Sequence, residues 1–281
     1  MDRVQPMDVL VSEWINAPEL QPEGREYAIG DVHAYARPLE AVLRAMGESA
    51  GKAGQGHLTF LGDLIDKGPD PAGALKLAVT SAEQWGFTGK TLLTGNHDLF
   101  LLLMLDDLRT GIGSRMAFLD IAASNGFMKT LGQLGVRDRP DLPHRLTELL
   151  GEEGVAQIDG MVGVRKSGNV TMSHAGPGWS YGIRADQWFV QPSRFRGFID
   201  GSEAHYTWTR FWWIREPLDP GFFIHGHTPE RMIREESLWR PELHRIDRQR
   251  LGLDGLGRGQ SERFVVGVEL ETGRYRIYSA G

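Results

Sequence analysis

The chain has 281 residues, of which 41% are hydrophobic and 24% are charged. This composition is typical of a globular protein with a substantial core, and it excludes a disordered or fibrous chain. The 31 basic and 37 acidic side chains give a formal net charge of −6, without the basic excess typical of nucleic-acid binding. The sequence contains no cysteine, which excludes disulfides, thiolate zinc sites and cysteine nucleophiles.

The N-terminal segment, residues 1–24, is interrupted by three prolines and ends in a glycine, so we expect a loosely docked lead-in. Residues 25–281 are predicted to form one domain, because no linker rich in glycine, serine or proline divides them. The N-terminus lacks the unbroken apolar stretch of a signal peptide. The longest apolar run, residues 99–105, is seven residues long, whereas a membrane span needs about twenty. We therefore expect a soluble, cytoplasmic protein.

Three predicted strands in the first half each run into a glycine and then a polar residue. They are residues 27–29, 58–61 and 91–94, followed by Gly30-Asp31, Gly62-Asp63 and Gly95-Asn96. Apolar residues at 39, 42, 43 and 46 have the spacing of a helix, and Asp70-Pro71 is a typical helix start. The polar residues at 31, 63 and 96 are 32 and 33 residues apart, which is the length of a strand–helix–strand unit. We therefore place them at the carboxyl ends of parallel strands, where open α/β sheets bind ligands.

The second half is predicted to contain further helices and strands. Residues 99–155 have a helical pattern, and strands at 170–172 and 221–224 precede His174 and His227. Residues 264–270 alternate with period two, and a turn at Thr272-Gly273 leads to a partner strand at 275–277. These patterns predict an α/β fold with additional antiparallel strands in its second half.

Five glycine-containing motifs carry residues that can bind a divalent metal ion. They are GDVHA (30–34), GDLIDKG (62–68), GNHD (95–98), SHAG (173–176) and HGHTP (225–229). The predicted ligands are Asp31, His33, Asp63, Asn96, His174 and His227. Asp63 could offer one oxygen to each of two ions, and a pair of ions forms a clamp for in-line displacement at phosphorus.

His97 directly follows one predicted ligand, and we predict that it is the general acid that protonates the leaving oxygen. Asp66 would hold its imidazole ring and favour the protonated form. Lys67 and an arginine near residues 213–215 would contact the substrate phosphate, and for that arginine Arg215 competes with Arg210.

As an ordered set, these motifs resemble the calcineurin-like metallophosphoesterases, and more narrowly the bacterial and phage branch of the phosphoprotein phosphatase (PPP) family. The resemblance runs from Tyr27 to about Gly255. It implies a metallophosphoesterase-type four-layered β-sandwich flanked by helices, with two divalent metal ions, usually manganese and otherwise iron, zinc, nickel or cobalt. It assigns Asp31, His33 and Asp63 to one ion, Asp63, Asn96, His174 and His227 to the other, the acid role to His97 with Asp66 behind it, and the phosphate contact to Arg215.

The chain departs from the protein phosphatase pattern at three positions. Lys67 stands where arginine is usual, which replaces a bidentate grip on phosphate by a point charge. Asp98 replaces the usual glutamate, in the form that diadenosine tetraphosphatases also have, and we interpret it as the N-cap of a helix beginning at Leu99. Ala34 replaces a glycine. Pro229 stands where broader metallophosphoesterases often have a second histidine, which favours the PPP family.

Other notable residues have two interpretations. His225 is expected to support a neighbouring ligand, and the remaining histidines to be surface or packing residues: His57, His144, His205 and His244. Four aromatic residues either pack a core or lid, or stack on an adenine or a peptide side chain: Trp208, Phe211, Trp212 and Trp213. The helical residues 99–150 either shape the substrate site or pack over one edge of the sheet.

The predicted function is hydrolysis of phosphomonoesters by direct attack of a metal-bound hydroxide, with a serine/threonine protein phosphatase as the first choice. The alternatives are a symmetrical diadenosine tetraphosphate hydrolase or another small-molecule phosphoesterase, and a catalytically silent interaction module. A nuclease is disfavoured by the net charge. The predicted partner is a phosphoprotein or a small phosphoester, with no nucleic acid and no membrane. The sequence does not indicate the oligomeric state.

Overall fold

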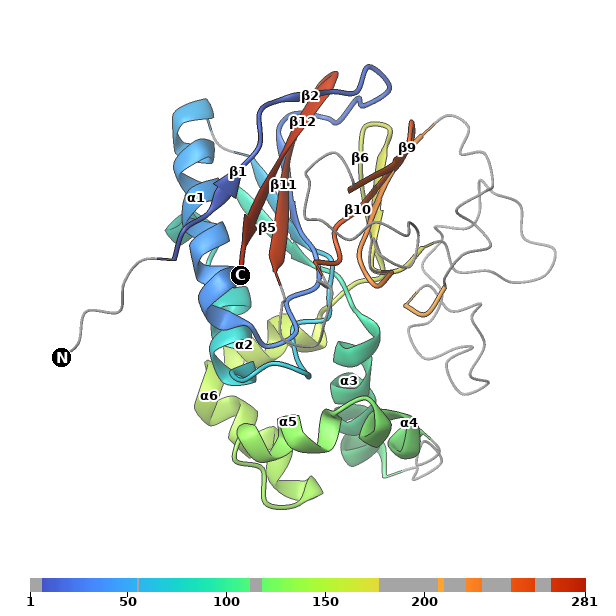
Figure 1. Cartoon of the computed structure of the whole chain (residues 1–281). Coiled ribbons are helices and arrows are strands. Elements are labelled where there is room, and N and C mark those ends of the chain that lie inside the picture. Colours follow the sequence, from blue (N-terminus) through green and yellow to red (C-terminus); the bar gives the residue numbers. More distant parts are fainter. Residues whose placement is uncertain are drawn as a thin grey trace.

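The computed structural model describes residues 7–54, 56–111, 118–176, 207–209, 221–228, 244–255 and 264–281. Over these ranges the chain forms two β-sheets and six α-helices (Figure 1). Within the same ranges, no helix has both the length and the apolar character that crossing a membrane requires.

The first sheet has seven strands, and the three strands at one side of it are parallel. Strands β3 (Glu26–Ile29), β4 (His57–Phe60) and β5 (Gly89–Leu92) pair in parallel, as the spacing of the motifs predicts. On the other side of β3, β11 (Val265–Glu271) and β12 (Arg274–Ala280) form the predicted hairpin, in which the left-handed backbone of the turn falls on Gly273. Two short strands, β1 (Leu10–Val11) and β2 (Ile15–Asn16), pair with β12.

The second sheet has five strands in the order β6-β7-β8-β10-β9. Their bounds are Val164–Ser167 for β6, Val170–Ser173 for β7, Phe222–His225 for β8, Arg245–Asp247 for β9 and Arg250–Gly252 for β10. Strand β8 pairs in parallel with both β7 and β10, whereas the outer pairs are antiparallel. The residues that follow β7, β8 and β10 therefore emerge at one edge of this sheet.

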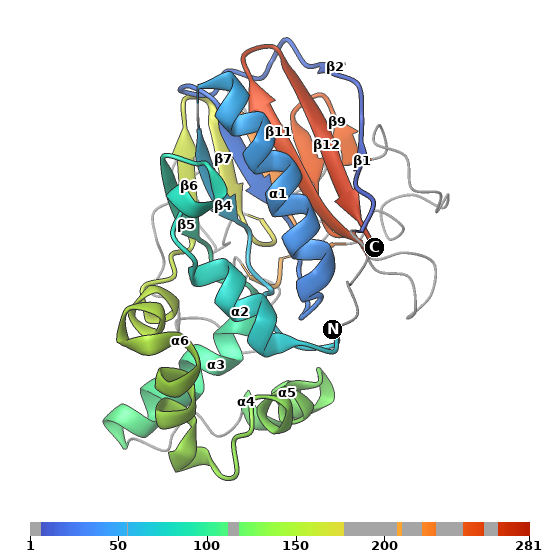
Figure 2. The same cartoon turned by 90° about the vertical axis from the view of Figure 1, so that its left-hand side faces the viewer.

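The helices gather in two places. Helix α1 (Ala36–Ala53) lies across the first sheet, and α2 (Pro71–Val79) follows β4 (Figure 2). Figure 2 also shows a group of four helices at one end of the molecule: α3 (Asn96–Thr110), α4 (Phe118–Ser124), α5 (Phe127–Gln133) and α6 (Leu142–Asp159). Two short 3₁₀ turns lie at Glu83–Trp85 and Arg139–Asp141. The helical pattern predicted for residues 99–155 thus corresponds to α3–α6, although α3 begins three residues earlier.

Both faces of the first sheet are buried, because neighbouring residues on its strands alternate between two hydrophobic cores. In β3, Tyr27 and Ile29 pack in the core that contains α1, whereas Ala28 belongs to the core between the sheets. Val266 and Val268 of β11 also belong to the core between the sheets. The chain therefore stacks a helix layer on two sheet layers, which confirms the predicted α/β fold.

The N-terminal segment is bound more closely than the loose docking that we expected. Strands β1 and β2 extend the first sheet through β12, and the side chains of Ala17 and Leu20 are fully buried. The prolines do interrupt any period, but strands of two residues need none. Their pairing depends on the edge that β12 offers, which the local sequence does not reveal.

Candidate metal centre and active site

The predicted ligands meet where the two sheets end. Asp31, Asp63 and Asn96 follow β3, β4 and β5, and His174 and His227 follow β7 and β8. Because these strands run in parallel within each sheet, their carboxyl ends lie at one edge. All six predicted ligands, with His33 included, are at most 5% exposed. The structure thus brings together side chains that the sequence separates by as many as 196 residues.

One group of possible ligands consists of His33, Asp63 and His97, whose ligand atoms lie within 4.8 Å of one another. The Oδ2 atom of Asp63 is 3.5 Å from His33 Nε2 and 3.9 Å from His97 Nε2. Asp31 lies beside this group, with its Oδ2 atom 3.7 Å from His33 Nε2. Compared with the predicted trio of Asp31, His33 and Asp63, the structure adds His97 to the same space.

The second group consists of Asp63, His174 and His227, again within 4.8 Å of one another. The Oδ1 atom of Asn96 lies 3.0 Å from His174 Nε2 and 2.9 Å from His227 Nδ1. Asp63 contributes its other oxygen here, because its Oδ1 atom is 3.4 Å from His174 Nε2. The two oxygens of Asp63 therefore face two different groups, which is the arrangement that a carboxylate shared between two ions requires.

The backbone of the site is held in an unusual conformation. Among the described residues, the non-glycine residues with positive φ all lie in the predicted motifs: His33, Ala34, Asp63, Asp66, Lys67 and His227. Each such residue costs about 1–3 kcal/mol, a cost that is typically met where function requires the geometry. The loop is fixed in part by the carbonyl of Asp63, which accepts the N–H groups of Val32 and His33 at 3.1 and 2.7 Å. Ala34, with φ of 61°, occupies a position that glycine adopts without strain.

Asp98 joins the start of α3 to the loop of Asp63. Its carboxylate accepts the backbone N–H groups of Asp63 and Leu64 at 2.7 and 2.9 Å, and that of Gly95 at 3.0 Å. Burial and the nearby Asp63 charge raise the pKa of Asp98 to about 7, against the effect of these donors. The prediction that Asp98 is an N-cap was wrong in position. Helix α3 begins at Asn96 with Gly95 as its N-cap, and Asp98 binds back from the third helical residue.

His97 and Asp66 form a buried pair. The Nδ1 atom of His97 lies 2.6 Å from Asp66 Oδ2, so Nε2 is the ring nitrogen that faces Asp63. The other oxygen of Asp66 accepts a hydrogen bond from the hydroxyl of Thr130 in α5. The sequence analysis missed Thr130, which lies 64 residues beyond Asp66 and carries no local signal.

Of the predicted phosphate contacts, Lys67 lies at the site, with its Nζ atom 2.8 Å from His33 Nε2. Trp208 is half-buried, with its ring centroid 5.8 Å from that of His227 and 6.3 Å from that of Phe100. The predictions for Arg210 and Arg215 lie outside the described residues. The same holds for His205, Phe211, Trp212, Trp213 and Pro229.

The other predicted histidines do not belong to either group. His225 is fully buried against the Gly226 carbonyl, and burial lowers its pKa to about 4. His57 bonds to Thr91 in the neighbouring strand, and His244 bonds to a backbone carbonyl. His144 lies on the surface. The places of His57, His244 and His144 agree with the packing and surface positions that we expected, whereas the supporting role of His225 stays a prediction.

The electrostatics of the site fit a cationic ligand. Burial, the Asp254 carboxylate and Asp63 together raise the pKa of Asp31 well above its usual value. Burial acts in the same direction on Asp63, but the neighbouring imidazoles of His174 and His97 lower its pKa overall. Asp254, which is also buried, was missed by the sequence analysis. It lies just beyond β10, and it reaches the site because β10 pairs in parallel with β8, a pairing that the local sequence does not reveal.

Comparison with protein families matches residues 25–257 to the calcineurin-like phosphoesterases. The match covers most of the chain, and the chain therefore belongs to this family. Divalent metal ions are typical of the family, and the two buried groups of histidine and aspartate could hold them. The members of this family are phosphoesterases, enzymes that hydrolyse phosphoric esters.

The similarity to individual proteins is either confined to part of the chain or low in sequence identity. A stretch of 95 residues is 35% identical to a symmetrical bis(5'-nucleosyl)-tetraphosphatase from Ralstonia nicotianae, and it covers 34% of this chain and 30% of that protein. A cold-active protein-tyrosine phosphatase from a psychrophilic Shewanella species is 18% identical, with a TM-score of 0.50 over 92% of this chain and 80% of that chain. A metallophosphoesterase from Sphaerobacter thermophilus is 17% identical, with a TM-score of 0.44 over 92% of this chain and 88% of that chain. At 18% identity, the Shewanella structure supports the fold alone.

Proposed function

We propose that the chain hydrolyses phosphomonoesters at a two-metal site, and that its substrates are phosphoserine and phosphothreonine side chains of proteins, as in the PPP family. The observation that carries this proposal is the buried His97–Asp66 pair beside Asp63, whose two oxygens face two groups of ligands. This arrangement combines an acid for the leaving group with a place for two cations.

We propose manganese as the metal: the carboxylate and amide oxygens of the donor set suit it, while the imidazole nitrogens also suit iron, zinc or nickel. We propose Asp31, His33 and Asp63 as ligands of one ion, and Asp63, Asn96, His174 and His227 as ligands of the other. When bound, such ions lower the pKa of a water molecule and offset the charge on the phosphoryl oxygens. The buried carboxylates of Asp254 and Asp63 lie near enough to Asp31 to raise its pKa. This excess of negative charge supports the binding of cations at the site.

The chain's own residues supply the remaining chemistry. In the proposed reaction, His97 holds a proton at Nε2 and donates it to the leaving oxygen, while Asp66 keeps the ring oriented through Nδ1. Lys67 contributes a positive charge toward the phosphate. Its ammonium now contacts His33 Nε2, so ligation by that nitrogen would release Lys67 for the substrate. Arg215 is proposed as a second phosphate contact.

The acid pair supports an ester of an alcohol as the substrate. A serine or threonine alkoxide is a strongly basic leaving group, and it departs readily only when it is protonated. A nucleoside diphosphate leaves as a stable anion and depends much less on an acid. The buried histidine–aspartate pair beside the site therefore favours a phosphoprotein as the substrate.

A symmetrical dinucleoside tetraphosphate is the second candidate substrate. The 35% identity to a symmetrical bis(5'-nucleosyl)-tetraphosphatase favours it, although only over 34% of this chain. Trp208 adds a physical reason, because its half-buried ring lies against His227 and could stack on an adenine.

The deciding experiment compares a phosphothreonine peptide with diadenosine tetraphosphate as substrates, in the presence of manganese, with His97→Asn as the control variant. We expect the peptide to be hydrolysed with the higher kcat/KM, and this activity to be lost in the variant. Preferential cleavage of the dinucleotide would reject the protein substrate and make Trp208 a candidate adenine contact. Failure to hydrolyse either compound would reject both substrates.

A further inference from the structure

Both oxygens of the Asp66 carboxylate are bound by side chains. Thr130 Oγ1 donates to Oδ1 at 2.5 Å, and His97 Nδ1 lies 2.6 Å from Oδ2. The three residues are at most 2% exposed, so no bulk water competes for these bonds. A carboxylate with a donor on each oxygen has no freedom to rotate, and it therefore fixes the plane of the imidazole ring.

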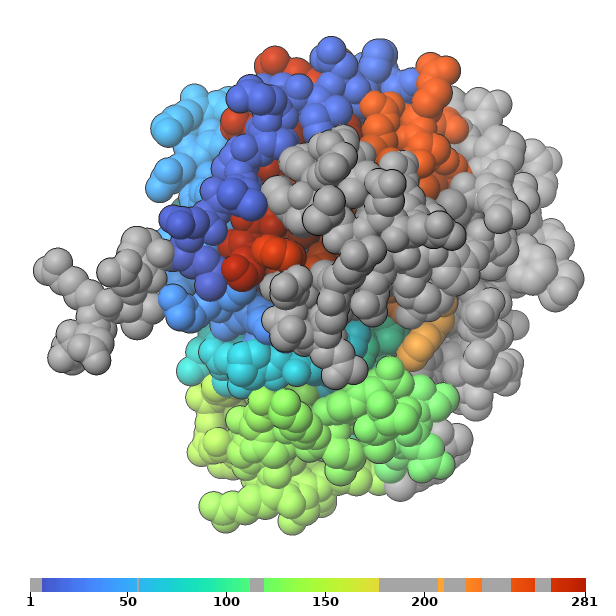
Figure 3. Space-filling view, viewed as in Figure 1, coloured from blue at the N-terminus to red at the C-terminus, as the bar shows by residue number. Residues whose placement is uncertain are grey.

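Helix α5 is tied to the same loop at a second point. Gln133, one turn after Thr130, donates its side-chain amide to the carbonyls of Gly68 and Pro69 at 3.2 and 3.1 Å. Figure 3 shows the green surface of α4 and α5 directly against the cyan segment that leads into α2. The loop that carries Asp66 is therefore held from below by α5, although more than sixty residues separate them in sequence.

An aromatic contact links the same helix to His97 by a second route. The ring of Phe127 in α5 lies 5.9 Å from that of Phe100, and Phe100 lies 5.8 Å from the imidazole of His97. All three rings are buried. Helix α5 thus reaches the acid through a hydrogen-bonded route and through an apolar one, and only the hydrogen-bonded route touches Asp66.

We propose that Thr130 is a positioning residue for protonation of the leaving group, acting through Asp66 on His97. This inference rests on the proposed acid role of His97. As the P–O bond breaks, its electron pair passes to the leaving oxygen, which takes the proton from His97 Nε2; the ring becomes neutral and keeps its Nδ1 proton against Asp66. Thr130 holds Asp66 in the orientation that aims Nε2. The helical region 118–133 thereby takes part in the reaction, beyond packing over the sheet.

The test uses two substrates that differ only in their leaving group. The 4-nitrophenolate ion leaves without protonation, whereas the more basic phenolate ion needs the acid. We expect Thr130→Val to lower kcat on phenyl phosphate on the order of tenfold, as for one hydrogen bond to a charged group, and to change 4-nitrophenyl phosphate much less. Thr130→Ser should restore the activity on phenyl phosphate. If the valine variant does not fold, Thr130→Ala takes its place, because it removes the same hydroxyl with a smaller side chain.

Gln133→Met is the matched control, because it removes the two hydrogen bonds of Gln133 to the loop and leaves the bond between Thr130 and Asp66 in place. A structural role of α5 would make Gln133→Met and Thr130→Val alike and would lower both activities equally, which overturns the inference. In the metal-free protein, a nitrogen-15 NMR spectrum should show the protected Nδ1 proton of His97 in the wild type, Thr130→Ser and Gln133→Met. Its persistence unchanged in Thr130→Val would also overturn the inference.

His97→Asn separates this inference from the proposed function. If it loses activity selectively on phenyl phosphate while Thr130→Val does not, only the role of Thr130 is wrong. If His97→Asn affects both substrates equally, the acid role fails and the inference fails with it. In the double variant, Thr130→Val should have no further effect once His97 is absent, because the two side chains act through one pathway.

Discussion

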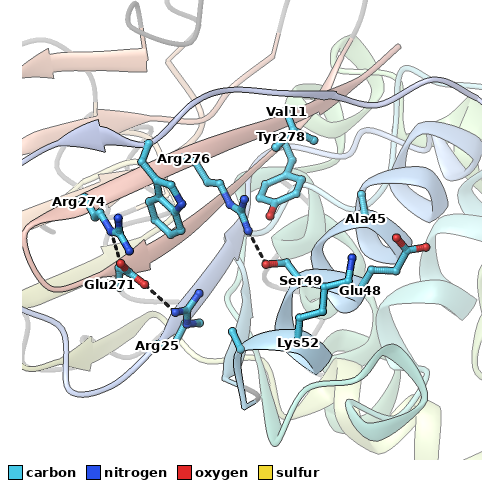
Figure 4. A pocket seen from close by; sticks show the side chains of 12 residues that line it. Val11, Arg25, Ala45, Glu48, Ser49, Lys52, Glu271, Arg274, Arg276 and Tyr278 are labelled. Atoms are coloured by element: carbon cyan, nitrogen blue, oxygen red, sulfur yellow. Dashed lines mark hydrogen bonds and ion pairs between the residues drawn. The ribbon is translucent and has the colours of Figure 1, made fainter.

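The first sheet carries two clusters of buried charge, and they are built in different ways. One lies at the carboxyl ends of β3–β5, around Asp31 and Asp63. The other lies on the face that packs against α1, where Glu269 of β11 pairs with Tyr27 of β3. Figure 4 shows part of this second cluster, in which Arg276 reaches Ser49 and Glu271 bridges to Arg25.

In the second cluster the chain supplies its own positive charge. Glu269 is fully buried, and it accepts hydrogen bonds from Arg276, Ser49 and Tyr278 at 2.7, 2.9 and 2.7 Å and pairs with Arg25. Burial raises the pKa of Glu269, but these donors lower it overall. The carboxyl therefore stays ionised without any external group.

At the strand ends the balance is the opposite. The pKa of Asp31 is raised by its burial and by the carboxylates of Asp254 and Asp63, and Lys67 is a neighbouring cation that opposes this effect. The positive-φ residues other than glycine also lie in this cluster, among the described residues. Buried charge that the chain balances indicates a structural role, whereas buried charge left for an external cation, on a strained backbone, indicates a site.

The most direct way to break this contrast is to remove the carboxylate that both ligand groups share. We expect Asp63→Asn to lose both metal ions, or at least their pairing, and to lower kcat/KM by more than the 10²–10⁴-fold typical of a lost general acid. Metal content after gel filtration and turnover of a phosphothreonine peptide are the measurements. Two retained ions with near-normal turnover would show that Asp63 is not shared.

The proposed acid can be removed without removing any of the proposed metal ligands. His97→Asn should lower turnover by about 10²–10⁴-fold, since it deletes the proposed proton donor, and it should leave the metal content unchanged. His97 Nε2 lies only 3.9 Å from Asp63 Oδ2, so His97 is itself near enough to be a metal ligand. Unchanged metal content in the variant is therefore a strict test of the acid role. Loss of metal equal to the loss of turnover would mean that His97 acts as a ligand rather than as the acid.

The second cluster should respond in the opposite manner. We expect Glu269→Gln to lower the free energy of unfolding by about 2 kcal/mol, because hydrogen bonds to a buried charge are lost, and to leave the turnover number unchanged. Urea unfolding and a phosphatase assay measure the two effects. The control is Arg44→Gln, which removes an exposed ion pair with Glu40 and should cost less than about 1 kcal/mol. A strong loss of activity in Glu269→Gln would end the distinction between the clusters.

The parts of the site that the sequence predicts are those with a local signal. Asp31, Asp63 and Asn96 each follow a strand and a glycine, and their spacing predicts the parallel order of β3, β4 and β5. The predicted hairpin of β11 and β12 is likewise confirmed, because period-two alternation and a turn glycine are both local features.

The parts that could not be predicted depend on packing between distant segments. Thr130 contacts Asp66 only because α5 packs against the loop that carries Asp66. Asp254 reaches the site because β10 pairs with β8, and neither strand has a local sequence feature that predicts this pairing. The N-terminal strands pair with β12, whose free edge exists only in the folded sheet. In each case the deciding contact is non-local.

The smallest expected effect concerns a histidine outside the strand-end site, whose burial should change the pH dependence of the free energy of unfolding. Burial, and then the Arg165 charge, lower the pKa of His57 to about 4, whereas in the unfolded chain it has its ordinary value near 6.5. Between these values the unfolded chain binds a proton that the folded chain does not. The stability contributed by His57 is therefore present above pH 6.5 and is lost as the pH falls toward 4.

We expect the free energy of unfolding of the metal-free protein to fall less steeply between pH 6.5 and 4 in His57→Gln than in the wild type. The difference should be below about 1 kcal/mol, because the ring retains partial contact with solvent. Urea unfolding at several pH values in the presence of a chelator measures it without any contribution from metal release. His144→Gln is the matched control for replacing an imidazole by an amide, since His144 lies on the surface. Equal slopes in His57→Gln and the wild type would show that the half-buried imidazole titrates normally, and that burial outside the strand-end site leaves a histidine free to ionise.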